Sequence, residues 1–266
     1  QRLPFNFSAT RGLTVSVREG GILANNLTAH VAGTDIGNAY LATLGDGVID
    51  SLSVDGELRL KTKGPITARD PTQVAIRAGD LILEAANASI AGTALAQVPL
   101  WVDVARGIHQ GADSFGSVTA RSTGPVNISA VGNLQVGGVF SRGAVVLTSV
   151  SGSIFDAHPG TGLDVLGGTL QLLAPLGPIG DVAGDRPLTV GTNTGTLLAG
   201  LIEAAAGQSI YLSGNPFNAP VSSNFALGPV LSGHDALNAG TAIRITAFDP
   251  DKTTTINGNV TAVGPV

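Results

Sequence analysis

The chain has 266 residues, of which 12% are charged, 4% are aromatic and 37 are glycine. This low charge content disfavours solvent-facing helices, which carry Glu, Lys and Arg on their outer face, and the high aliphatic content argues against disorder. The net charge of −5, with three lysines in all, argues against a nucleic-acid partner.

Short segments of alternating aliphatic and polar residues run along the chain and predict strands with one buried face. Gly, Asn, Asp or Pro usually follows within a few residues, as strand boundaries require. The clearest of these segments are residues 13–17, 58–61, 170–172, 210–213 and 243–246. A sandwich of hairpins has the same local alternation, so the fold has to be decided by the spacing between repeated motifs along the chain.

Residues 56–181 repeat one unit, in which a glycine is followed by an alternating strand, a corner of small residues and then, in most copies, Gly-x-Ile or Gly-Pro-Ile. The copies start at Gly56, Gly79, Gly143 and Gly168. A repeat of this size is typical of a solenoid, in which each unit buries its apolar face by stacking on the next.

The tripeptide Gly-Pro-Ile/Val supports a solenoid. Its copies start at Gly64, Gly124, Gly177, Gly228 and Gly264, at intervals close to multiples of roughly 18 to 20 residues, the size of one coil. Glycine permits the tight turn, proline interrupts the ladder, and Ile or Val points inward onto its equivalent one coil away. The sequence therefore predicts an all-β fold, a parallel β-helix with short protruding loops, in which each corner lies above the last.

Two regions, 91–117 and 213–242, lack the repeat and are predicted to be loops that protrude from the solenoid. The segment 197–207 is the one plausible helix, although a strand followed by a corner is favoured there.

Three residues of the two loop regions are candidate contacts for a ligand or partner: Trp101, His109 and Phe217. A lone tryptophan on an aromatic-poor chain is suited to stacking on a sugar or anchoring a partner. A packing role for Trp101 is favoured, because aliphatic residues flank it.

The densest acidic group, Asp46, Asp50, Asp55 and Glu57, is the one to consider for polysaccharide hydrolysis, which needs carboxylates about 5–9.5 Å apart. Asp-Gly is a turn pair, so corner positions are the favoured interpretation. The chain has no cysteine, and its four histidines have no ligand-like spacing. The sequence therefore predicts no enzyme, no catalytic residue, no metal and no cofactor.

The segments 145–156 (Val-Val-Leu-Thr-Ser-Val-Ser-Gly-Ser-Ile-Phe-Asp) and 162–181, which ends in Leu-Gly-Pro-Ile-Gly-Asp, resemble the repeat region of filamentous-haemagglutinin-like exoproteins. These are large bacterial adhesins exported by two-partner secretion. The resemblance implies a right-handed β-helix, secretion to the bacterial cell surface, and a role in attachment or biofilm. The asparagine-rich secretion signature of such proteins is missing here, so either this is an internal segment or the export route differs.

Residues 1–266 are expected to form a single β-solenoid segment, a fragment of a longer chain, without a membrane-spanning segment. The expected function is a non-catalytic structural or adhesive segment that displays loops toward a host or neighbouring-cell surface or its glycans. One alternative is a fibre assembled end to end, because the open ends of a β-helix favour self-association. The other is a β-helix enzyme that processes polysaccharides.

Overall fold

The structure is a computed structural model, in which every regular element is a strand. It divides into two compact units, residues 1–131 (unit 1) and 132–266 (unit 2), and each is described by itself. The residues that the structure describes are 13–17, 22–24, 27–29, 38–104, 116–159, 162–181, 184–192, 200–214, 225–232, 243–246, 254–256 and 260–261.

The strands of unit 1 pair in parallel. They are β1 (Leu13–Val17), β2 (Ile22–Ala24), β3 (Leu27–Ala29), β4 (Ala39–Thr43), β5 (Gly47–Ile49), β6 (Leu52–Thr62), β7 (Ile66–Ala68), β8 (Ile76–Ala85), β9 (Leu100–Asp103), β10 (Ser117–Ser122) and β11 (Val126–Ala130).

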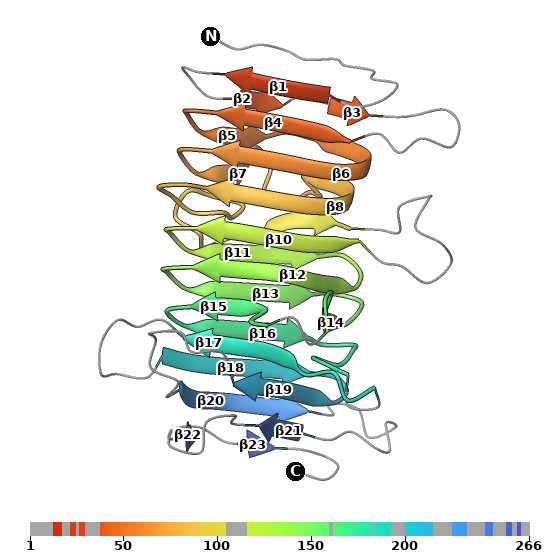
Figure 1. The fold of residues 1–266 in the computed structure, drawn as a ribbon, viewed down its shortest axis with the longest axis vertical. Coiled ribbons are helices and arrows are strands. Elements are labelled where there is room, and N and C mark those ends of the chain that lie inside the picture. Colours follow the sequence, from red (N-terminus) through yellow and green to blue (C-terminus); the bar gives the residue numbers. More distant parts are fainter. Residues whose placement is uncertain are drawn as a thin grey trace. The chain divides into compact units, whose positions relative to one another are not determined.

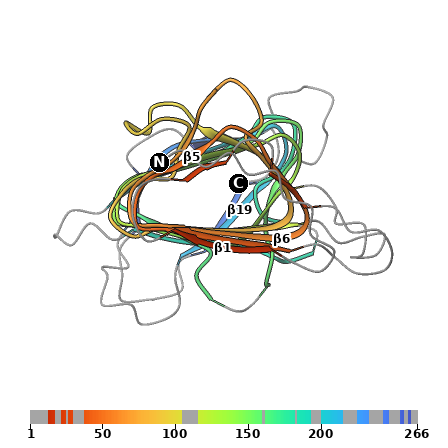
Figure 2. The same cartoon turned by 90° about the horizontal axis from the view of Figure 1, so that it is seen from above.

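In unit 1, β4, β6, β8 and β10 lie side by side and point in the same direction (Figure 1). Their register places aliphatic residues in inward columns, one of which is Ala39, Leu58, Leu81 and Val118, all fully buried. With these strands pointing to the left in Figure 1 as the chain descends, the coils seen from above in Figure 2 wind in a right-handed sense around this interior. The predicted right-handed parallel β-helix is therefore confirmed.

The corner residues of unit 1 stack as predicted, but several of its coils are longer than predicted. Ile66 pairs with Ile90, and Ile90 with Val126, which places the residue after Gly64-Pro65 in one column with the residue after Gly124-Pro125. The two steps take 24 and 36 residues, so the interval of 60 between the two glycines holds two coils rather than three. A period of 18 to 20 residues holds for the step from Ala39 to Leu58, which takes 19 residues, but is wrong for these two steps because longer connections separate their strands.

Several corners are closed by a side-chain hydroxyl group that binds the glycine two positions later. The Gly45 N–H donates to Thr43 Oγ1 (3.0 Å), Thr62 Oγ1 donates to the Gly64 carbonyl (2.6 Å), and the Gly124 N–H donates to Ser122 Oγ (3.1 Å). Each such bond stabilises the corner by about 1 kcal/mol net. The pattern Ser/Thr-x-Gly is thus a second sequence signal of a corner, beside Gly-Pro-Ile/Val.

The predicted loop over 91–117 is wrong over part of its length. Residues 100–103 form β9, with Leu100 buried in register with Ile128. Residues 91–99 are a loop without a strand, in which Leu95 is 80% exposed, and Asn127 Nδ2 on β11 donates to the Ala96 carbonyl of this loop at 2.9 Å. Residues 105–115 lie outside the described part of the chain.

Unit 2 has the same parallel architecture. Its strands are β12 (Leu134–Ser141), β13 (Val145–Ser149), β14 (Ile154–Asp156), β15 (Val165–Gly167), β16 (Leu170–Ala174), β17 (Leu188–Thr192), β18 (Gly200–Ala206), β19 (Ile210–Gly214), β20 (Phe225–Ser232), β21 (Ile243–Thr246), β22 (Thr254–Ile256) and β23 (Val260–Thr261). One corner column of this unit contains Ile154, Ile179 and Ile210, all fully buried.

Two further expectations are settled in unit 2. The strand favoured within 197–207 is confirmed by β18, but the loop predicted over 213–242 contains β20 and is wrong there. The Gly228-Pro229-Val230 tripeptide lies inside β20 instead of at a corner. It sits where the register with β18 shifts, between Ile202 and Ala204. An irregularity of this kind accommodates a proline, which cannot donate to the ladder.

Candidate functional site

Of the three predicted contact residues, the structure describes Trp101. It lies on β9, where its side chain is half-buried between the buried Leu100 and Val102, and its carbonyl accepts the Ala75 N–H at 3.0 Å. His109 and Phe217 lie outside the described residues. A ligand-binding role for these three residues stays a prediction.

The acidic group predicted to form corners is distributed over different positions. Asp46 is exposed at the corner before β5, beside Gly64. Asp50 follows β5, and its carboxylate lies 3.9 Å from the Arg69 guanidinium. Glu57 is on β6 and pairs with a different arginine; the side chain of Asp55 lies outside the described part.

The outward side of β4, β6, β8 and β10 carries a concentration of charge, which we call the charged face. In-register rows run across these strands, one of which contains Lys61, Glu84 and Arg121. The residues of the charged face are Asn38, Tyr40, Ala42, Glu57, Arg59, Lys61, Lys63, Asp80, Ile82, Glu84, Ser117, Thr119 and Arg121. Seven of them are charged, in a chain in which 12% of residues are.

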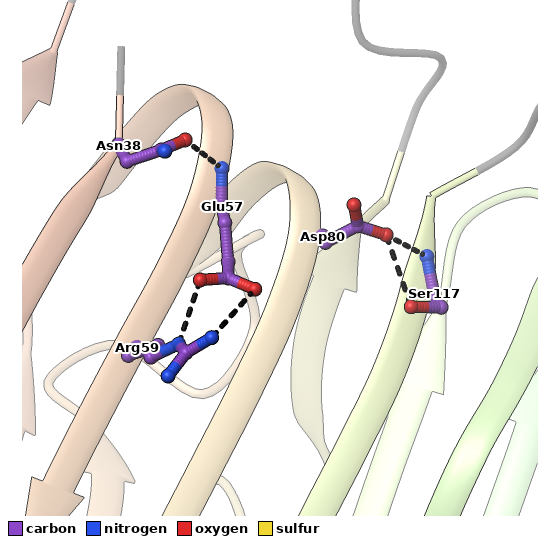
Figure 3. A network of polar contacts seen from close by, with 5 residues as sticks. All are labelled: Asn38, Glu57, Arg59, Asp80 and Ser117. Carbon is purple, nitrogen blue, oxygen red and sulfur yellow. Dashed lines mark hydrogen bonds and ion pairs between the residues drawn. The ribbon is translucent and has the colours of Figure 1, made fainter. Parts of the chain in front are cut away.

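Arg59 is the centre of one network on the charged face (Figure 3). Its Nε donates to Glu57 Oε1 at 2.6 Å and its Nη2 to Glu57 Oε2 at 3.3 Å. The guanidinium also lies 5.3 Å from the centre of the Tyr40 ring, a cation–π contact. The hydrogen bond and the charge of Glu57 raise the pKa of Arg59 above its usual value, so this residue is cationic at every pH of interest.

Hydrogen bonds also hold the acidic residues of the charged face in place. The Glu57 N–H donates to Asn38 Oδ1 (2.8 Å), and Asp80 Oδ1 accepts bonds from the Ser117 N–H and hydroxyl (2.8 and 2.9 Å; Figure 3). Lys61 Nζ lies 2.8 Å from Glu84 Oε1. The charged face is therefore an ordered array of cations and hydrogen-bond acceptors.

Unit 2 contains a buried carboxyl group that sequence reasoning missed. Asp164, 5% exposed, accepts the Thr189 N–H on Oδ2 at 2.7 Å, and its own N–H and carbonyl bind Thr189 and Val139 in the flanking coils. Burial, and then the nearby Asp156 carboxyl group, raise the pKa of Asp164 to about 8, against the lowering effect of the Thr189 amide. Asp164 is therefore protonated at neutral pH.

Within the described ranges, no group of three or more His, Asp or Glu side chains is placed to hold a metal ion, and no helix is long and apolar enough to cross a membrane. Comparisons with protein-family models, curated proteins and solved structures gave no match. The fold therefore defines the class, a parallel β-solenoid, and the charged face is its candidate site.

Proposed function

We propose that this chain is a non-catalytic structural and adhesive segment of a secreted bacterial cell-surface protein, displaying its outer surface for attachment or biofilm formation. The observation that carries the proposal is the in-register stacking of buried aliphatic columns under an ordered, charged outer face. Each coil is held by a parallel ladder to the next, an arrangement that suits a protein working outside the cell.

The engagement of the acidic residues of the charged face supports a role in recognition. Glu57 and Glu84 are each paired with a cation, and Asp80 accepts two hydrogen bonds from Ser117. Carboxylates that are held in fixed positions in this way suit recognition of a surface. The resemblance of 145–181 to exported adhesin repeats points to the same role.

The experiment is antibody labelling of intact cells of the producing bacterium, together with adhesion of beads coated with the purified chain. Labelling of intact, unpermeabilised cells and bead retention on cell or biofilm surfaces are the expected results. Labelling that requires permeabilised cells would contradict the proposal. So would turnover of an acidic glycan that is lost on Asp46→Ala or Asp50→Ala.

A further inference from the structure

Three exposed cations at alternate positions, which we call the cationic row, lie on β6 and directly after it: Arg59 and Lys61 on the strand, and Lys63 at the corner that follows Thr62. Arg59 and Lys61 project from the same outward side of the strand, about 6.6 Å apart along it. Their side chains are 56% and 63% exposed, and Lys63 is exposed as well. The row therefore presents positive charge to solvent along the end of β6 and onto the corner.

The row is unusual for this chain. It contains two of the three lysines in a protein with a net charge of −5. Among the described residues Lys63 has no ion-pair partner, and Lys61 pairs with Glu84, which is itself 41% exposed on its side chain. Exposed pairs of this kind are weak, so an incoming anion can replace the internal partner at little cost.

We propose that the cationic row binds a linear acidic polysaccharide whose carboxylate groups lie along β6. This inference rests on the proposed adhesive function and names the class of partner. The charge complementarity is direct, because carboxylates of the polymer meet Arg59, Lys61 and Lys63. Arg59 binds Glu57 through Nε and Nη2, and its fork geometry lets a carboxylate of the polymer replace Glu57 in the same bidentate contact.

The neighbours of the row favour an acidic polysaccharide over a nucleic acid. Glu57, Asp80 and Glu84 stand beside the cations, and their negative charge weakens the field that a densely charged phosphate backbone needs. The same carboxylates accept hydrogen bonds from hydroxyl groups, which sugars supply in number. Tyr40, against Arg59, adds apolar surface for a sugar ring.

The test is binding of the whole chain to immobilised polygalacturonate at about 50 mM and about 300 mM NaCl, since screening separates charge contacts from others. The double variant Lys61→Gln/Lys63→Gln should bind at least about tenfold more weakly at low salt and lose most of its salt dependence. Lys61→Arg/Lys63→Arg should bind like the wild type. Arg142→Gln removes an exposed cation in unit 2 and is the matched control. All variants change exposed side chains, and circular dichroism checks that each is folded.

The inference would be overturned by no binding of polygalacturonate by the wild type, by equal binding by Lys61→Gln/Lys63→Gln, or by tighter binding of DNA than of polygalacturonate at equal charge. Neutral mannan should not bind, and mannan binding equal to that of polygalacturonate would also refute it. If intact cells are labelled but polygalacturonate is not bound, the ligand class is wrong while the adhesive function stands. Labelling only after permeabilisation would remove the adhesive function itself.

Discussion

Replacing Asp164 with asparagine should remove most of the pH dependence of local stability around β12, β15 and β17. The pKa of Asp164 is about 8 in the folded protein and 3.8 for an unperturbed aspartate. Between these values the native state holds a proton that the unfolded chain has lost, so the free energy of unfolding falls as pH rises. The stabilisation is complete below about pH 4 and is lost as the pH passes through about 8.

The magnitude follows from the width of this window. About four pH units at about 1.4 kcal/mol each give a change on the order of 5 kcal/mol, caused first by the burial of Asp164 and then by the nearby Asp156 carboxyl group. Asparagine cannot ionise, its amide oxygen can still accept the Thr189 N–H, and its NH2 group can donate to Asp156. The variant should match the wild type near pH 4 and exceed its stability by several kcal/mol at about pH 8.5.

The assay is amide hydrogen exchange at Val139 and Thr189, whose N–H groups bind Asp164, corrected for the intrinsic pH dependence of exchange. Urea unfolding at the same pH values provides the global counterpart. The reasoning is refuted if the wild-type opening free energy does not fall between about pH 5 and pH 8, or if the variant falls in parallel with it.

Further substitutions test the corners, the core and an exposed acid. Gly124→Ala should destabilise the protein by about 1–3 kcal/mol, because its Cβ would meet backbone atoms at 2.8–3.0 Å. The Cβ of Gly132→Ala meets nothing within 4 Å, so this control should change the free energy of unfolding by less than about 0.5 kcal/mol. The midpoints of urea unfolding compare the two variants. Leu58→Ala should cost about 2–5 kcal/mol in the same assay and Leu58→Met much less, since Leu58 is fully buried; equal losses would contradict its column position. Hydrogen bonds from Thr72 lower the pKa of the exposed Asp70, so its ionised form stabilises the folded state. Asp70→Asn should therefore reduce the free energy of unfolding at pH 7, and should leave it unchanged below the lowered pKa of Asp70, where the wild-type carboxyl group is protonated. An NMR titration that gives Asp70 an ordinary pKa would disprove this.

The sequence was sufficient to predict the fold because solenoid corners need particular residues. Ile66 and Val126 could be placed in one column from the Gly-Pro-Ile/Val pattern alone, and the structure puts Ile90 between them. The coil length was not predictable, because connections between strands lengthen without any effect on the register. For the same reason β9 and β20 were hidden within segments interpreted as loops.

The charged face and the buried acid differed in how far sequence could reveal them. The alternation of Arg59, Lys61 and Lys63 is visible in the chain, but the approach of Glu84 to Lys61 depends on a register that spans 23 residues. Asp164 could not be identified, since nothing local distinguishes it from Asp156 or from the other acids. Its burial arises from the flanking coils, which meet it through Val139 and Thr189.

The inward columns of unit 1 keep one register although different lengths of chain separate their members. Leu58 follows Ala39 by 19 residues and precedes Leu81 by 23, and Val118 lies a further 37 residues on. The contacts in the core are therefore set by the strands alone, and the length of the connections between the strands does not affect them. Such a scaffold can accept foreign peptides between strands without redesign of its interior, so its outer surface can change by insertion while its fold is conserved.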